Sequence, residues 1–251
     1  MLFRSWNDDQ AKLLSESIPD VTATAVGRMA LSRYLPLLLD RARITVGLTV
    51  ASMAFAILLG LPLALLRLYG PAPLRLLSLL YIEFFRGIPV LILLYFLYYG
   101  LPVVAENGGL GTSFALAPWQ AAILGLGLNY AAYEAEIYRA GISSLPAGQW
   151  EAAESLGMSR WTTFRRIILP QAVRVILPPM TNDFVALYKD TSIVSVIAVV
   201  ELTKEYQILS KSTFQYLEIG LATAVLYLIM SVPLGHLSRY LEKRWAVPGG
   251  G

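Results

Sequence analysis

Long apolar segments recur along this chain and alternate with short segments that carry most of its charged residues. A helix needs about 20 consecutive apolar residues to cross the hydrocarbon core of a bilayer. We predict spans at about residues 44–66, 74–99, 116–137, 176–200 and 216–237. Charged residues make up 15% of the chain, whereas soluble domains have about 25%. The sequence therefore predicts an all-α integral membrane protein with five transmembrane helices.

Glycine and proline mark the expected ends of several spans. Gly70-Pro71 separates the first two spans, and Gly100-Leu101-Pro102 is expected to form a turn after the second. Pro178 and Pro179 interrupt the fourth span and are expected to bend it.

The basic residues predict how the chain faces the membrane. Segments 67–75, 139–174 and 239–244 hold ten Lys and Arg residues, whereas 100–115 holds none and 201–215 holds two. Short basic loops remain in the cytoplasm, so the N-terminus is expected outside and the C-terminus inside. We expect residues 1–41 to be an extracytoplasmic or interfacial segment, 42–241 the transmembrane domain and 242–251 a cytoplasmic tail.

Several kinds of chemistry lack their sequence signals. The chain has no cysteine and one histidine, His236, which argues against a metal or haem site, and no cofactor is expected. It also lacks the Gly-x-x-x-x-Gly-Lys-Ser/Thr phosphate loop, so any ATPase must be a separate chain. The basic residues are dispersed between apolar segments, which does not indicate a nucleic-acid surface.

The longest cytoplasmic segment predicts two short helices at about residues 143–168. Gly157 can adopt the left-handed conformation that ends the first helix, and Ser159 can cap the second. Pro170 is expected to prevent the second helix from continuing into the next span. Two interpretations follow from the residues alone: an amphipathic pair on lipid headgroups, or a docking element for a partner.

The same segment carries a recognisable motif. It resembles the "EAA loop" of binding-protein-dependent ABC import permeases at Glu151, Ala152, Ala153, Gly157, Ile167, Leu169 and Pro170. Residues 83–89 (EFFRGIP) and 189–197 (KDTSIVSVI) are similar to segments of the polar amino-acid branch of that family. The resemblance covers about residues 34–242. It departs from the usual pattern at Ile88, where threonine is usual, at Leu93, where glutamine is common, and at Arg41, where glycine is usual. The first two make the second span less polar than expected, which leaves the exact substrate open.

The resemblance implies a type I importer permease, which is not itself an enzyme, in the bacterial inner membrane. It implies that the loop inserts into a cleft of a cytoplasmic ATPase subunit. The implied partners are a dimer of ABC ATPase subunits, a second permease subunit (identical or related), an extracytoplasmic amino-acid-binding protein, the amino-acid substrate and the lipid bilayer.

Charged residues inside the predicted spans are costly unless paired or hydrated. One interpretation is internal pairing, of Glu83 with Arg86 and of Lys189 with Asp183 or Asp190. The other is a site for a zwitterion, because a free amino acid needs a counter-charge for its carboxylate and for its ammonium. The resemblance favours this second interpretation. The candidate substrate residues are Arg86, Lys189, Asp190, Glu83 and Asn129, of which Asn129 can alternatively bridge two helices.

Three other functions remain open at this stage. The permease can carry another zwitterion, such as an opine or a small peptide-like compound. An ion channel would line its pore with the same charges. A membrane-embedded enzyme would use Glu134, Glu136 or Asp183 as acid and base, although no nucleophile–base pair or metal constellation accompanies them.

Overall fold

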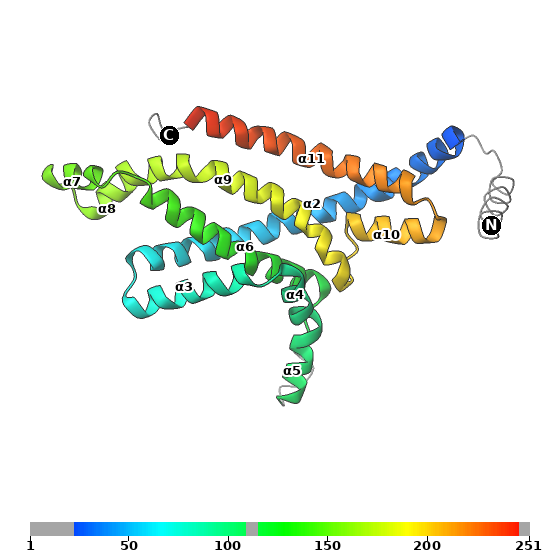
Figure 1. The fold of residues 1–251 in the computed structure, drawn as a ribbon, viewed down its shortest axis with the longest axis horizontal. Coiled ribbons are helices and arrows are strands. Elements are labelled where there is room, and N and C mark those ends of the chain that lie inside the picture. Colours follow the sequence, from blue (N-terminus) through cyan, green and yellow to red (C-terminus); the bar gives the residue numbers. More distant parts are fainter. Residues whose placement is uncertain (1–22, 109–114, 246–251) are drawn as a thin grey trace, which may run out of the picture.

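A computed structural model describes the backbone of residues 23–108 and 115–245, and the side chains of these ranges from residue 33 onward. Every regular element within these ranges is helical, which confirms the predicted all-α class (Figure 1). In chain order the elements are α2 (Ala23–Tyr69), α3 (Ala72–Gly87), α4 (Val90–Tyr95), the π turn η1 (Phe96–Gly100), α5 (Leu101–Asn107), α6 (Pro118–Ser143), α7 (Gly148–Ser155), α8 (Arg160–Thr163), the π turn η3 (Phe164–Ile168), α9 (Leu169–Asp190), the 3-10 helix η4 (Thr191–Ile197), α10 (Leu202–Thr213) and α11 (Tyr216–Trp245).

Helix α6 lies at the centre of the fold and packs against α2, α3 and α9. Its contact with α2 is close because glycines remove side chains between the two backbones. A Cβ atom added at Gly60 would lie 2.9 Å from the carbonyl oxygen of Ala131, and one at Gly127 would lie 2.5 Å from the ring of Phe55. These glycines therefore fix the distance between the first and third predicted spans.

Gly60→Ala should destabilise the protein, because the new methyl group meets backbone atoms of α6 that cannot move independently. We expect a loss of roughly 1–3 kcal/mol, measured as a lower midpoint of thermal denaturation in detergent. Gly47→Ala is the matched control on the same helix, since an added Cβ there meets nothing within 4 Å. That control should stabilise α2 by up to about 1 kcal/mol. Equal midpoints for the two variants would contradict the close packing.

Three helical stretches in the described residues are long and apolar enough to cross a membrane: Arg33–Tyr69, Val90–Asn107 and Tyr216–Trp245. Helices α6 and α9 have 26 and 22 residues and correspond to the predicted third and fourth spans, but they are less apolar. More than half of α6 is buried among the other helices, so protein rather than lipid surrounds it. A centrally placed helix can carry polar residues, because such residues of membrane segments face the interior of the bundle.

The predicted second span is interrupted. Helix α3 ends at Gly87, and Ile88 is extended (φ −100°, ψ 131°) before Pro89. The residue before a proline is disfavoured in the helical region, which explains the break. The chain is then helical from Val90 to Asn107, so the turn predicted at Gly100-Leu101-Pro102 is wrong. Pro102 lies in the first turn of α5, where its missing N–H is tolerated.

The ends of the long helices agree with the basic-loop pattern. In Figure 1 the α2–α3 turn, helices α7 and α8, and the end of α11 lie at one end of the molecule. Helix α10 and the start of α2 lie at the other end. Helix α2 runs without a break across the predicted boundary at residue 41, and residues 1–22 of the expected N-terminal segment and 246–251 of the tail lie outside the described residues. The three basic segments therefore share one end of the structure.

The unusual Arg41 has a structural role at the opposite end. Its Nε donates to Glu205 of α10 at 3.1 Å, and Glu205 is only 5% exposed. Next to it, the carboxylate of fully buried Glu201 caps α10 by accepting from the backbone N–H groups of Thr203 and Lys204. The arginine thus neutralises a buried carboxylate and ties α10 to α2.

Candidate functional site

A cavity of about 480 Å³ opens between the α3–α4 junction, α6 and α9. The junction contributes Arg86 and the extended residues around Pro89, and it lies near the middle of the molecule's length in Figure 1. The break in the second span therefore exposes backbone and a charged side chain halfway between the two ends. Irregular backbone at membrane depth is tolerated where it lines such a cavity.

Hydrogen bonds from α6 and its neighbours hold this junction in place. The Asn129 side-chain amide donates to the carbonyl oxygen of Phe85 at 2.7 Å, and the Tyr81 hydroxyl donates to the carbonyl oxygen of Leu128 at 2.8 Å. Asn129 lines the cavity, but its amide N–H also joins α6 to α3, as the helix-bridging alternative predicted.

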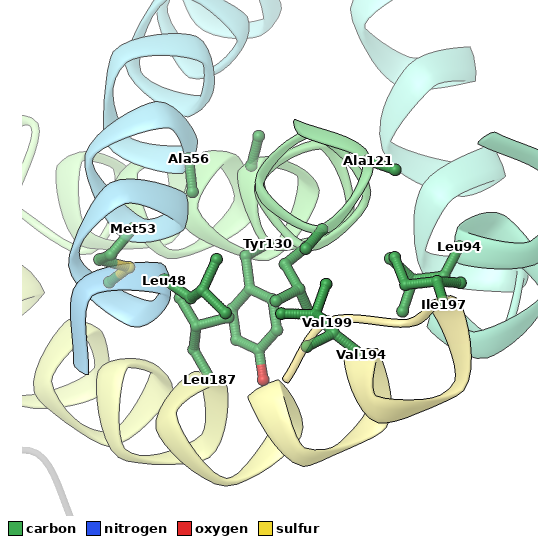
Figure 2. Close-up of a cluster of buried hydrophobic side chains, with 13 residues drawn as sticks. Leu48, Met53, Ala56, Leu94, Ala121, Tyr130, Leu187, Val194, Ile197 and Val199 are labelled. Atoms are coloured by element: carbon green, nitrogen blue, oxygen red, sulfur yellow. The ribbon is translucent and has the colours of Figure 1, made fainter. Parts of the chain in front are cut away.

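Tyr130 connects the cavity to the hydrophobic core. Its ring lies among Leu48, Leu187 and Val194, with the hydroxyl directed toward the yellow ribbon of α9 and η4 (Figure 2). The hydroxyl donates to Asp190 Oδ2 at 2.8 Å. Because the ring is locked by packing, this hydrogen bond fixes the orientation of the Asp190 carboxylate.

Three charged side chains line the cavity: Arg86, Asp183 and Asp190. The Arg86 guanidinium lies over the ring of Tyr133, 5.3 Å from its centroid, so the aromatic face supports the cation without consuming its N–H donors. One carboxylate oxygen of Asp183 is buried and has no hydrogen-bond partner among the described residues. The site thus presents a donor-rich cation from α3 and two acceptors from α9.

The structure brings together three of the five predicted substrate residues: Arg86, Asp190 and Asn129. Glu83 and Lys189 are exposed and lie outside the lining of this cavity. Lys189 adjoins Asp190, and consecutive positions of a helix point in different directions. Glu83 lies one turn before Arg86 on α3, farther from the α3–α4 junction that lines the cavity. Asp183, Tyr130 and Tyr133 were not among the predicted site residues. Spacing is a signal that identifies Asp183: it lies seven residues before Asp190, two turns away on the same face of α9.

Among the side chains that the structure describes, Glu83, Arg86, Asp183, Lys189 and Asp190 form no ion pairs with one another. The ion pairs among the described side chains join Arg41 to Asp40 and Glu205, and Glu136 to Arg67 and Arg139. Glu83–Arg86 and Lys189–Asp183 are therefore not ion pairs here, and Arg86 is available to a ligand. The Glu136 group instead joins the ends of α2 and α6 beside the predicted cytoplasmic loop.

That loop has the bent shape that its glycine predicts. Helix α7 ends at Ser155, and Gly157 adopts φ +72°. The backbone N–H of Gly157 donates to the carbonyl of Glu154, and that of Met158 to Ala153, which is the Schellman arrangement. The Ser159 side chain then accepts from the Thr162 backbone N–H, as predicted.

Two boundaries of the loop differ from the prediction. Helix α7 begins at Gly148 rather than near residue 143, because α6 continues through Ser143. The expectation that Pro170 separates the second loop helix from the next span is wrong, since α8, η3 and α9 follow one another without a break. The π turn bonds Leu169 N–H to the Phe164 carbonyl, and Pro170 falls in the first turn of α9, where no N–H is required.

The residues of the motif divide between an outer and an inner face. Glu151 and Ala152 are exposed on α7, whereas Ala153 of the same helix is 1% exposed and packs inward. Outside α7, the motif residues Gly157, Leu169 and Pro170 are also exposed. Gln149 and Gln171 exchange two side-chain hydrogen bonds of 2.8 and 2.6 Å, which attach α7 to the start of α9. These hydrogen bonds connect α7 directly to the helix that carries Asp183 and Asp190.

A second and larger groove, of about 1010 Å³, separates α7 and α8 from the end of α2. Tyr69, Trp150 and Trp161 line it, together with Leu65 and Leu66. Aromatic side chains of this kind are enriched where membrane meets water. One side of the loop therefore carries side chains typical of a membrane interface, whereas Glu151 and Ala152 of α7 are exposed and do not line the groove.

Comparison with known proteins shows the family. The profile of the family described as "binding-protein-dependent transport system inner membrane component" matches residues 56–247, which include the cavity and the α7–α8 loop. The chain belongs to this family. Its members are inner-membrane transport components, which confirms the resemblance found in the sequence and agrees with a transport rather than an enzymatic role.

Individual relatives agree over most of their length. The chain is 38% identical to the probable amino-acid permease protein YxeN of Bacillus subtilis (strain 168), over 85% of this chain and 93% of the relative. It is 36% identical to the glutamine transport system permease protein GlnP of Escherichia coli (strain K12), over 85% and 94%. A solved structure described as an amino acid ABC transporter with histidines is 34% identical, with a TM-score of 0.77 over 86% of this chain and 97% of that chain.

Proposed function

We propose that this chain is the permease subunit of an ATP-driven amino-acid importer and that the cavity between α3, α6 and α9 binds the transported amino acid. The main evidence for the site is the presence of Arg86 and two aspartates in one cavity, next to a helix junction that lies near the middle of the molecule's length. A guanidinium can bind a carboxylate in bidentate fashion, and a carboxylate can accept from an ammonium group. The relatives named for amino-acid transport support the substrate class.

The proposal assigns the α7 face of Glu151 and Ala152 to a cytoplasmic ATPase subunit. Its position at the end that carries the three basic segments supports this side as cytoplasmic. A second permease subunit completes the pathway, and an extracytoplasmic binding protein delivers the substrate at the end that carries α10. Conformational change reaches the cavity through the hydrogen-bonded contact of α7 with α9.

The test is ATP-dependent accumulation. The tagged chain is purified with the subunits that accompany it, reconstituted in proteoliposomes with the binding protein, and assayed with a mixture of radiolabelled amino acids. We expect an ATP-binding subunit to co-purify and radiolabel to accumulate only when ATP is present on the side of that subunit. Equal accumulation without ATP would indicate a channel, and chemical conversion of the solute would indicate an enzyme.

A further inference from the structure

We infer that the substrate of this permease is an amino acid with a cationic side chain, and that Asp183 is the residue that selects it. This inference rests on the proposed function, because it assumes that the cavity is the substrate site. It goes beyond that proposal by naming the charge of the substrate and the residue that binds the side chain.

The charges of the cavity do not balance for a neutral zwitterion. Its described lining holds one cationic residue, Arg86, and two acidic residues, Asp183 and Asp190. Lys189 is exposed and is not part of the lining, so it does not supply the missing cation. Fully buried Glu134 lies against the α2 backbone, with its Cβ 3.0 Å from the position of a Cβ at Gly60, and also adds no positive charge.

The three charged groups can be assigned to the parts of an amino acid. Arg86 carries the donors that suit the α-carboxylate. Asp190 is oriented by Tyr130, which occupies one of its oxygens and leaves acceptor capacity for the α-ammonium group. Asp183 then remains, with a buried oxygen that has no partner among the described residues. That oxygen is therefore an acceptor that the protein leaves unused, and a second cation on the substrate would bind to it.

Within the described part of the chain, no donor is hydrogen-bonded to this oxygen of Asp183. The Asn129 amide nitrogen is already bonded to the Phe85 carbonyl, and Tyr130 is bonded to Asp190. Ala186, between the two aspartates on the same face of α9, leaves room for a ligand. A neutral amide such as that of glutamine could donate a hydrogen bond to Asp183, but it would leave the second negative charge uncompensated.

The spacing of the two aspartates also favours a long side chain. Asp183 and Asp190 are separated by two helical turns, or about 10 Å along α9. Lysine and arginine carry their second cation at the end of an extended chain, far from the α-ammonium group. A small polar side chain cannot approach both aspartates at once.

The test is direct binding to the purified permease–ATPase complex in detergent, without the binding protein, because that protein has its own specificity. The probes are radiolabelled L-arginine, L-lysine, L-glutamine and L-glutamate. Wild type should prefer arginine or lysine to glutamine, and glutamate should bind most weakly. Asp183→Asn keeps the size of the side chain and removes its charge, so arginine or lysine affinity should fall about 10- to 100-fold while glutamine affinity changes little.

Glu106→Gln is the matched control, since Glu106 is an exposed carboxylate on α5 away from the cavity. It should leave the order of the four amino acids unchanged, and both variants should retain the wild-type elution profile and denaturation midpoint. If Asp183→Asn proves unstable, Asp183→Glu replaces it and should retain the preference for a cation.

Two outcomes separate this inference from the proposed function. If Arg86→Gln removes binding of all four probes but Asp183→Asn leaves the arginine-to-glutamine ratio unchanged, the cavity is the site and the inference on charge is overturned. If neither variant alters any binding, the cavity is not the substrate site and both proposals fail. A wild-type preference for glutamine or glutamate would also overturn the inference.

Discussion

Arg86→Gln is expected to abolish amino-acid uptake while leaving the assembly with the ATPase intact. The substitution removes the cation in the cavity but keeps a side chain that can pack near the ring of Tyr133. A substrate carboxylate would then bind in the cavity without its counter-charge. Hydrogen bonds to charged groups contribute roughly 1.5–3 kcal/mol, and their loss corresponds to a fall in uptake of about 10-fold or more at low substrate concentration.

The measurement is ATP-driven uptake of radiolabelled amino acid in proteoliposomes, with co-purification of the ATPase measured in the same preparations. Lys189→Gln is the matched control, because it also removes a cation near the cavity but from an exposed side chain that does not line it. It should retain most of the uptake. The reverse result, in which Lys189→Gln abolishes uptake and Arg86→Gln does not, would contradict the proposal that Arg86 binds the substrate in this cavity.

Ala152→Trp should prevent the ATPase from associating and thereby abolish uptake. Ala152 is exposed on the outer face of α7, so a large side chain there obstructs a partner without disturbing the packing of Ala153 beneath it. Interfaces pack as closely as protein interiors, and a group of this size cannot be accommodated in a fitted cleft. We expect co-purification of the ATPase to fall by at least about 10-fold, with the thermal stability of the permease unchanged.

Ala72→Trp is the corresponding control. Ala72 is exposed at the start of α3, at the same end of the molecule but outside the α7–α8 loop. This variant should retain the ATPase. If both tryptophan variants behave alike, the loss would reflect a general effect of bulk at this end of the molecule, and the assignment of α7 as the docking helix would be wrong.

The sequence predicted helix caps and turns well where a residue type strongly favours one local conformation. Gly157 adopts the left-handed conformation expected of it, and Ser159 caps the following helix. Both outcomes depend only on neighbouring residues. The family resemblance was also readable, because its motifs are short segments with fixed spacing, and the family profile confirms it.

The errors in the helix boundaries arose from prolines, whose effect depends on position. Pro102 and Pro170 were expected to end helices, yet each lies in the first turn of one. Pro89 does end a helix, through the extended conformation of Ile88. A π turn directly precedes the helical turn that contains Pro102 and the one that contains Pro170. In a π turn the N–H groups bond to carbonyls five residues back, and such turns have no clear sequence signal.

The candidate site could be predicted only in part because it is built from three helices. The charges of Arg86 and Asp190 stand out in an apolar segment, but which charges face the same cavity depends on how α3, α6 and α9 are rotated. Lys189 adjoins Asp190 in sequence and yet lies outside the lining. Asp183 was interpreted as a pairing partner of Lys189, whereas the seven-residue spacing to Asp190 places both aspartates on one face.

The most direct test of the account is a cryo-electron microscopy structure of the permease–ATPase complex with bound L-arginine. The account predicts ligand density between Arg86 and the two aspartates of α9, with the carboxylate on Arg86, and the outer face of α7 seated in the ATPase. Ligand density away from this cavity, or an ATPase that contacts the permease without α7, would contradict it.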